Sequence, residues 1–252
     1  MTVEILVAGP LDNPEDGFGL QQAILEEVAS GERVPTALIW SSSPYVGATR
    51  PETRLEGFAG AAESVEDLGF PVLVRNSGGG AVAANRGSLS FSLTMPVRDL
   101  RHGLYERYAQ GVELVASALR KLGVEAEGGG VEGEFCPGAY SVRSGGERGV
   151  KHAGLAQRVT RRAARLEALV LVEDTAPVRE ALARFYGGLG LPFRPSGVAD
   201  LPAGLPEVVA ALSEEVVGRY GGRRGSVDGE VLEKARALRE KWRFIPGTGS
   251  SL

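Results

Sequence analysis

A glycine-rich loop between two predicted strands, at residues 75–92, constrains the fold more than any other stretch of this 252-residue chain. The apolar run Pro71 to Val74 precedes the loop, and an alternating apolar run at residues 89–95 follows it. Alternation with a period of two residues predicts a strand rather than a helix. Three consecutive glycines, Gly78 to Gly80, lack the Cβ atoms that would keep a ligand away from the backbone. The loop is therefore predicted to border a ligand, although glycines alone do not identify it.

Helical and strand patterns alternate irregularly along the rest of the chain. The predicted helices cover residues 14–30, 55–68, 104–122, 177–186 and 207–220, and a last one runs from a cap at Asp228 to Trp242. The predicted strands cover residues 36–40, 71–74, 89–95, 134–143, 151–160 and 166–172. Residues 41–54 are predicted as a loop that borders a pocket, and residues 187–206 as a linker or surface excursion. This order predicts an α+β fold of mixed β-sheets packed with α-helices. We expect a main domain at residues 1–195 and a helical extension at residues 196–252, packed on the same domain.

The overall charge excludes some classes of partner. A formal charge of −4 and a pI near 5.5 predict binding neither to nucleic acid nor to an acidic membrane surface. The first residues lack a basic region followed by a long apolar segment, and no apolar stretch approaches the ~20 residues that span a bilayer. The expected location is the cytoplasm.

The single cysteine, Cys136, leaves two readings open. It cannot form an internal disulfide, so it is either a small buried hydrophobic residue or a reactive thiol. A thiolate is a strong nucleophile, and the thioester that it forms can pass its acyl group to an amine. Such a thiolate needs a nearby cation or backbone dipole, and Lys151 is the candidate cation.

Three segments share a resemblance to a known family. They are RNSGGGAV at residues 75–82, FCPGAYSV at residues 135–142 and KHAGLAQR at residues 151–158. In this order they resemble the lipoate and octanoate attachment superfamily, which also contains the biotin protein ligases. Within it they are most similar to octanoyltransferases that move an octanoyl group from the glycine-cleavage H protein to lipoyl domains of 2-oxoacid dehydrogenases. The similarity runs from about Leu38 to Phe193.

The resemblance implies a biotin/lipoate protein ligase-like catalytic domain with assigned site residues. Cys136 would carry the acyl group, and Lys151 would stabilise the oxyanion that forms on the acyl carbonyl. The implied substrate-binding residues are Arg75, Ser77, Gly78, Gly79, Gly80, Ala81, Gly154, Ala156 and Gln157. For Gly154 and Ala156, a role in packing is the alternative interpretation. For Lys151, the alternative is a solvent-exposed lysine in a turn.

Some residues depart from the family pattern. Asn76 occupies the place where ATP-using ligases of the superfamily have a second arginine. This difference argues against adenylation. We therefore expect no cofactor beyond the covalent octanoyl or lipoyl cargo. Residues 84–86 and Ser90 also differ from the residues that are common in the family, and these differences bear on the acceptor site. His102 and His152 do not form a metal pair with one cysteine, so no metal is assigned, and we expect a structural role for His152.

Four hypotheses follow for the function. The first is octanoyl or lipoyl transfer from the H protein through a cysteine acyl-enzyme. Others are transfer from acyl carrier protein, ATP-dependent lipoate ligation, and non-catalytic binding of octanoate or a lipoyl domain. Two arginine-rich segments, residues 219–224 and residues 161–165, are either docking sites for acidic protein modules or solvated turns.

Overall fold

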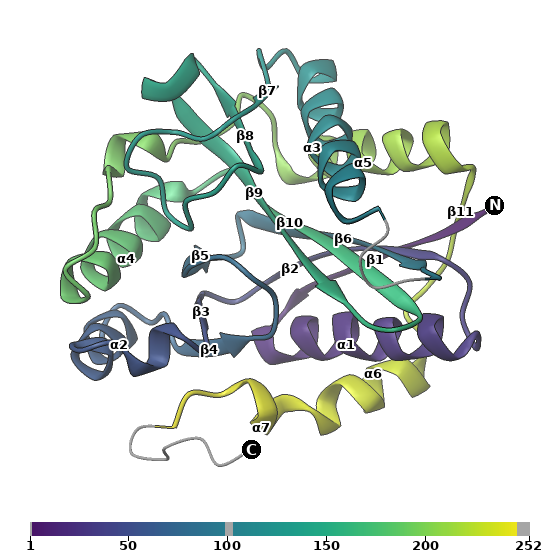
Figure 1. Ribbon diagram of the computed structural model, residues 1–252, viewed down its shortest axis with the longest axis horizontal. Helices are drawn as coiled ribbons and strands as arrows, with labels where there is room; N and C mark the ends of the chain where they lie inside the picture. Colours follow the sequence, from purple (N-terminus) through teal and green to yellow (C-terminus); the bar gives the residue numbers. More distant parts are fainter. Residues whose placement is uncertain (1, 99–102, 246–252) are drawn as a thin grey trace.

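Two β-sheets of unequal size form the frame of the protein in the computed structural model, which describes residues 2–98 and 103–245 (Figure 1). The large sheet contains, in spatial order, β11 (Gly222–Arg224), β1 (Val3–Leu11), β2 (Thr36–Ser42), β6 (Ser88–Pro96), β10 (Ala163–Leu171), β9 (Val150–Val159), β8 (Ser141–Ser144) and β7 (Glu127–Gly128). The small sheet contains β4 (Val72–Arg75), β3 (Tyr45–Thr49) and β5 (Val82–Ala84). β1 pairs in parallel with β2 and β11, whereas the other strands of the large sheet pair antiparallel. The mixed pairing confirms the predicted α+β class.

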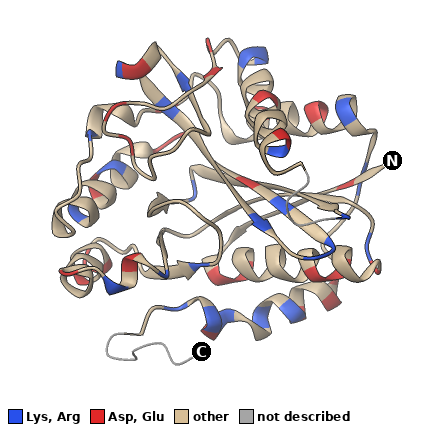
Figure 2. Ribbon diagram, in the orientation of Figure 1, with Lys and Arg blue, Asp and Glu red and all other residues tan. Residues whose placement is uncertain are grey.

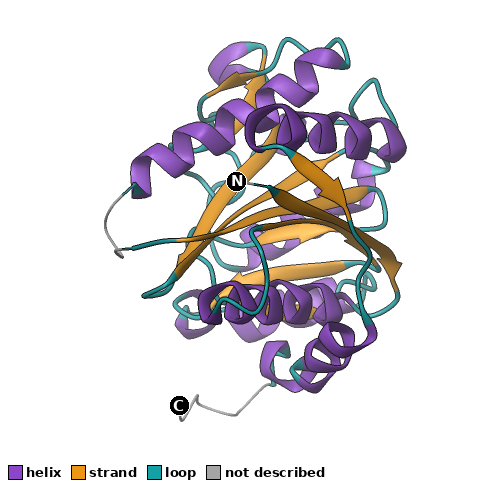
Figure 3. Ribbon diagram, turned by 90° about the vertical axis from the view of Figure 1, so that its right-hand side faces the viewer, coloured by secondary structure: helices purple, strands orange, loops and turns teal. Residues whose placement is uncertain are grey.

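Helices cover both faces of the large sheet, as Figure 3 shows. They are α1 (Pro14–Ser30), α2 (Phe58–Glu66), α3 (Leu104–Lys121), α4 (Thr175–Gly188), α5 (Leu205–Tyr220), α6 (Gly229–Ala237) and α7 (Arg239–Trp242), with 3-10 turns at Glu52–Arg54, Gly146–Arg148 and Pro195–Gly197. One apolar cluster lies between the sheet and α3 and α5. The other joins the opposite face to α1, α2, α4 and the small sheet. Among the described helices, none combines the length and apolar character that a membrane crossing requires.

Strand β6 separates these two layers. Its apolar residues Leu89, Phe91 and Leu93 belong to the cluster beneath α3 and α5. The intervening side chains, Ser88 to Thr94 in steps of two, are also buried, but on the face that α1 covers. Of these residues, Ser88 donates its hydroxyl to Asn85, and Ser90 lines a pocket between the sheet and α1.

Ion pairs hold the C-terminal helices against α1, and Figure 2 shows the basic ribbon of α6 and α7 alongside acidic parts of α1. Lys234 lies 2.9 Å from Glu27, and Arg239 lies 2.6 Å from Asp16. The helices also approach closely, because a Cβ on Gly19 would lie 2.4 Å from a backbone oxygen of α6. These contacts fix α6 and α7 against α1, while the predicted boundary at residue 195 stays a prediction.

The predicted helix boundaries agree with the structure at several caps. α1 begins at Pro14 and ends before Gly31, which adopts the left-handed conformation with φ 86°. α6 is capped at Asp228, whose carboxylate accepts the Val231 N–H at 2.8 Å. Local side-chain chemistry decides such ends, so the sequence shows them.

Four predictions of elements were wrong or incomplete. Residues 41–54 are not only a loop, because they contain β3, which pairs with β4 and β5. The predicted strand at residues 134–143 is mostly a loop, since only Ser141 onward joins the sheet. The last predicted helix is interrupted at Leu238 between α6 and α7. No strand was predicted at β1, β5, β7 or β11, although β1 lies inside the large sheet between β11 and β2.

Candidate active site

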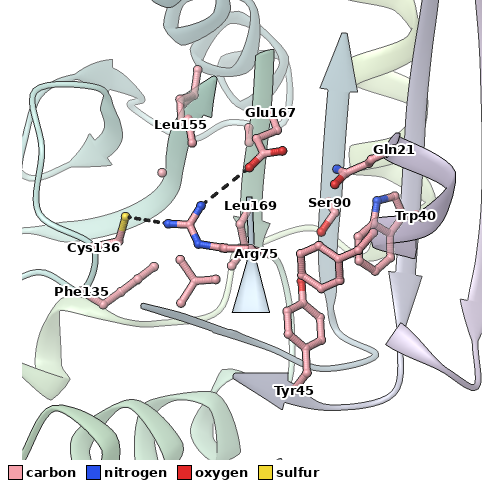
Figure 4. Close-up of a pocket in the computed structure, with 15 residues that line it drawn as sticks. Gln21, Trp40, Tyr45, Arg75, Ser90, Phe135, Cys136, Leu155, Glu167 and Leu169 are labelled. Carbon is pink, nitrogen blue, oxygen red and sulfur yellow. Dashed lines mark hydrogen bonds and ion pairs between the residues drawn. The ribbon is translucent and has the colours of Figure 1, made fainter. Parts of the chain in front are cut away.

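A mostly apolar pocket lies between α1, the large sheet and the loop that carries Cys136 (Figure 4). We call it the Cys136 pocket. Its empty space, counted out to the open mouth, is about 510 Å³. Its lining residues are Phe18, Gln21, Trp40, Tyr45, Arg75, Val82, Ser90, Phe135, Cys136, Gly154, Leu155, Ala156, Glu167, Ala168 and Leu169. The pocket therefore joins a thiol at one end to aromatic side chains at the other.

The Cys136 thiol faces two hydrogen-bond donors from the glycine loop. The Gly80 N–H lies 3.2 Å from the sulfur, and Nη2 of the Arg75 guanidinium lies 3.6 Å from it. Cys136 itself has φ 45°, a backbone conformation that non-glycine residues rarely adopt. Such strain at a pocket residue is typical of functional sites. Arg75 is one cation close to the sulfur, and Lys151, the cation that the sequence predicted, also interacts electrostatically with Cys136.

Tyr186 of α4 connects the cysteine loop to the glycine loop. Its hydroxyl accepts the Cys136 N–H at 2.6 Å and donates to the Ala81 carbonyl at 2.9 Å. Burial raises the pKa of Tyr186 above its ordinary value. The hydroxyl therefore keeps its proton and can serve both bonds at once. Nothing in the three motifs pointed to Tyr186, since α4 lies about 50 residues from the cysteine in sequence.

The glycine loop is held in place by a buried carboxylate and by Arg75. Glu52 accepts the Ala81 N–H at 2.7 Å, and Arg75 donates to Ser77 at 3.0 Å and to the Gly80 carbonyl at 2.6 Å. Gly79 has φ 94°, and a Cβ there would lie 2.6 Å from the Cys136 sulfur. Only glycine fits at this position without moving the thiol.

Lys151 lies beneath the cysteine loop with its ammonium fully buried. Nζ donates to the Phe135 carbonyl at 2.8 Å and to the Cys136 carbonyl at 3.1 Å, and it lies 3.3 Å from the Glu134 carboxylate. Burial lowers the pKa of Lys151, while Cys136 and Glu134 oppose that shift. These three partners match the three donor hydrogens of an ammonium group. In this arrangement Lys151 fixes the backbone on both sides of the thiol.

A β-bulge brings Lys151 to the pocket side of β9. Arg143 pairs with Lys151 and Val142 pairs with Ala153, so His152 has no partner residue on β8. Without the bulge, Lys151 and Gly154 would face opposite sides of the sheet. Instead a Cβ on Gly154 would lie 3.0 Å from the Lys151 Cε. The glycine therefore leaves room for the lysine stem.

His152 takes a structural position on the same strand. Its Nε2 lies 2.7 Å from the Ser144 hydroxyl, and burial lowers the pKa of His152 to about 4. Among the described residues no group of three metal-ligating side chains forms a site. His102 lies outside the described residues.

Glu134 organises the loop that the sequence read as a strand. Its carboxylate accepts the Gly138 N–H at 3.1 Å, the Ser141 hydroxyl at 3.2 Å and the Val131 N–H at 3.2 Å. A side chain thus replaces the hydrogen bonds that a neighbouring strand would have provided. This explains why the apolar pattern around Cys136 was misleading.

The far end of the pocket is aromatic, with a few polar groups. Phe18 lies edge-on to Trp40 and Tyr45, with ring centroids 5.7 and 5.3 Å away. The Tyr45 hydroxyl is hydrogen-bonded to Ser90, and burial raises the pKa of Tyr45 to about 12. The Trp40 indole N–H is buried without a hydrogen-bond partner in the described structure. Figure 4 shows the Gln21 amide directed toward the same space.

Within the described residues, the pocket lining contains two charged side chains, Glu167 and Arg75. Glu167 lies 3.7 Å from Arg75 and 3.0 Å from the buried Arg165. Arg165 also donates to Asn76 at 2.9 Å. Asn76 therefore serves as an acceptor for a buried arginine, a role that a second arginine at this position could not fill.

The structure brings most of the predicted site residues together. Arg75, Cys136, Gly154 and Ala156 line the pocket, and Lys151 and the glycine loop directly adjoin it. Gln157 does not line it, because its amide donates to the Leu104 carbonyl of α3 at 2.9 Å. Their roles in binding and catalysis stay predictions.

Comparison with known proteins places the chain in a family. The Lipoyl protein ligase A/B catalytic domain profile matches residues 13–217. The octanoyl-GcvH:protein N-octanoyltransferase of Geobacillus kaustophilus is 30% identical over 206 residues, which cover 82% of this chain and 71% of that protein. The crystal structure of a lipoate-protein ligase A bound with ATP has a TM-score of 0.76 at 20% identity, covering 96% of this chain and 95% of that one.

A second solved structure has the same fold. A bipartite lipoate protein ligase of Thermoplasma acidophilum has a TM-score of 0.71 at 19% identity, over 96% of this chain and 93% of that one. At such identities the structures establish the fold alone, and the sequence match establishes the family. The chain therefore belongs to the lipoyl protein ligase A/B catalytic domain family and is a transferase.

Proposed function

We propose that this transferase moves an octanoyl or lipoyl group between lysine side chains of two proteins through a thioester at Cys136. The donor is GcvH, the glycine-cleavage H protein that the name of the Geobacillus relative specifies. The acceptors are lipoyl domains of 2-oxoacid dehydrogenases. The observation that carries the proposal is a half-buried thiol at one end of an apolar pocket, 3.2 Å from a backbone N–H and 3.6 Å from a guanidinium.

In the first half-reaction the Cys136 thiolate attacks the amide carbonyl of the donor's acyl-lysine. The carbon–sulfur bond forms, the carbon–nitrogen bond breaks, and the leaving lysine amine takes the proton that the thiol released. Negative charge develops on the carbonyl oxygen next to the sulfur. The Gly80 N–H and Arg75 are the donors nearest to that position, and preorganised donors of this kind stabilise such charge.

In the second half-reaction the amine of the acceptor lysine attacks the thioester. The new carbon–nitrogen bond forms as the carbon–sulfur bond breaks, the thiolate leaves, and the amine loses its extra proton to water. No nucleotide is consumed in either half-reaction. The apolar lining between Leu155 and Leu169 is suited to the hydrocarbon chain.

Lys151 acts in this proposal by holding the thiol in place. Its bonds to the carbonyls of Phe135 and Cys136 fix the two residues that determine where the sulfur points. Direct contact between Lys151 and the acyl carbonyl would require one of these bonds to be exchanged for the substrate.

A test of the proposal incubates the protein with octanoylated GcvH in the absence of ATP. Intact mass is expected to show a hydroxylamine-labile octanoyl adduct, and adding an apo-lipoyl domain should discharge it. Cys136→Ala is expected to give no adduct. An adduct that persists in Cys136→Ala would disprove the cysteine assignment, and transfer that requires ATP would disprove the nucleotide-free route. Faster loading from octanoyl-acyl carrier protein would overturn the choice of donor.

A further inference from the structure

Four arginines gather at the end of the long β9–β10 hairpin. They are Arg98, Arg158, Arg161 and Arg162, and we call them the hairpin patch. All four side chains are exposed, and within residues 2–98 and 103–245 none of them takes part in an ion pair or a side-chain hydrogen bond. Figure 2 shows the basic ribbon at this end of the sheet. Such a concentration of free positive charge contrasts with a chain whose formal charge is −4.

The second arginine-rich segment differs in this respect. Arg219 lies 3.0 Å from Glu215, and Arg223 lies 3.3 Å from Glu4. Acidic neighbours thus compensate part of the charge at residues 219–224. The hairpin patch has no acidic ion-pair partner within residues 2–98 and 103–245, so it attracts an acidic protein partner more strongly.

A rigid turn presents the hairpin patch. The Thr160 N–H donates to the Ala163 carbonyl at 2.8 Å, which closes the turn around Arg161 and Arg162. The Val97 N–H donates to the Arg162 carbonyl at 2.8 Å, so Arg98 is held beside the turn. Because the backbone is fixed, binding orders only the arginine side chains.

The patch continues the strand face that forms the Cys136 pocket. Gly154 and Ala156 line the pocket, and Arg158 is the next residue on the same face of β9. Gly154 and Arg158 are separated by four residues, or about 13 Å along a strand. A domain of about 100 residues has a radius of gyration near 13 Å, so one placed over the pocket reaches the patch as well.

We propose that the hairpin patch docks the acidic face of the protein domain that presents its lysine to Cys136, acylated in the donor and free in the acceptor. Donor and acceptor both bring a lysine to the same thiol, so each uses this surface in turn. Guanidinium groups bind carboxylates in a bidentate manner, and exposed charges of this kind raise association rates in a salt-dependent way. The inference rests on the proposed acyl transfer and adds to it the surface that selects the protein substrates.

The test compares two double variants that change the charge equally. Arg161→Glu with Arg162→Glu alters the hairpin patch, and Arg223→Glu with Arg224→Glu alters an exposed pair elsewhere. With octanoylated GcvH as the probe, the first variant is expected to raise KM roughly tenfold without changing kcat, and to weaken the salt dependence of kcat/KM. The second variant is expected to behave like the wild type. Equal KM values in the two variants would overturn the docking surface.

Two further measurements separate docking from chemistry. Loading of Cys136 by a small octanoyl thioester, octanoyl-N-acetylcysteamine, needs no docked domain and is expected to be equal in all three proteins. If the wild type is not loaded but its binding to GcvH still depends on the hairpin patch, the proposed function fails and the docking surface stands. If the hairpin variant loses affinity for a DNA duplex but not for GcvH, the patch is a nucleic-acid site and the docking proposal is wrong.

Discussion

The two ends of the Cys136 pocket are built in different ways. At the thiol end, two loops meet, and their positions are set by hydrogen bonds between backbone groups and the side chains of Tyr186, Glu52 and Lys151. At the far end, the side chains of Phe18 and Trp40 pack between a helix and a sheet. The thiol end thus depends on single polar atoms, whereas the far end depends on buried area.

This difference determines how substitutions should act. Loss of one polar atom at the thiol end moves a reacting group, and small displacements reduce rates strongly. Loss of one polar atom at the far end changes only how well the cargo and the core are packed. The following predictions test the contrast, from the largest expected effect to the smallest.

Lys151→Met should have the largest effect. It leaves the buried Glu134 carboxylate without its cation, and breaking such a pair costs about 3–5 kcal/mol of unfolding free energy. Urea denaturation measures this loss. The control Lys121→Met removes an exposed lysine that pairs with Glu215, and it should leave the unfolding free energy nearly unchanged because solvent screens this pair. A cost below 1 kcal/mol for Lys151→Met would show that the ammonium does not hold the loop.

Gly79→Ala should reduce the acylation rate of Cys136 about a hundredfold. The new Cβ would lie 2.6 Å from the sulfur, at a residue whose φ is 94°, so the thiol must move. Single-turnover loading from the small octanoyl thioester measures the rate. Gly60→Ala, which adds a Cβ with no neighbour within 4 Å, is the matched control. A rate within threefold of the wild type would contradict the observed geometry.

Tyr186→Phe should lower kcat about tenfold and leave KM for octanoylated GcvH unchanged. The change removes only the hydroxyl that links the Cys136 N–H to the Ala81 carbonyl. The rate of thiol alkylation by iodoacetamide across pH provides a second readout, which a purely structural role would leave unchanged. Tyr220→Phe removes a half-buried hydroxyl on α5 as a control. If both kcat and the alkylation rate were unchanged, Tyr186 would have no role in the site.

Gln21→Leu should have the smallest effect, with the opposite sign. Gln21 is a largely buried residue whose amide faces the pocket space, and no hydrogen bond engages that amide within the described residues. Replacing an unpartnered amide in this apolar pocket with an apolar side chain is expected to raise the unfolding free energy by at most about 1 kcal/mol. The turnover rate with octanoyl cargo should stay within twofold. A loss of stability would show that the Gln21 amide has a hydrogen-bond partner. The far end of the pocket would then depend on single polar atoms, as the thiol end does.

The sequence predicted much of the fold and some of the site. Residues that act through local chemistry, such as Pro14 at a helix start and Asp228 at a cap, were correctly read. The three motifs predicted the family, and Arg75, Cys136 and Gly154 do meet in one pocket. By contrast, Glu52 and Tyr186 belong to no motif. Each of them binds a backbone group that lies far away in the sequence. Long-range contacts of this kind leave no periodic signal.

The sequence by itself therefore determined the family, the elements with clear periodicity and the presence of one thiol beside a glycine loop. Only the tertiary structure decided how the thiol is surrounded. It turned the predicted strand around Cys136 into a loop, because Glu134 satisfies backbone groups there. It also inserted a bulge at His152, which moves Lys151 to the side of Gly154. A strand's alternation assumes regular pairing, and one unpaired residue reverses which face a side chain occupies.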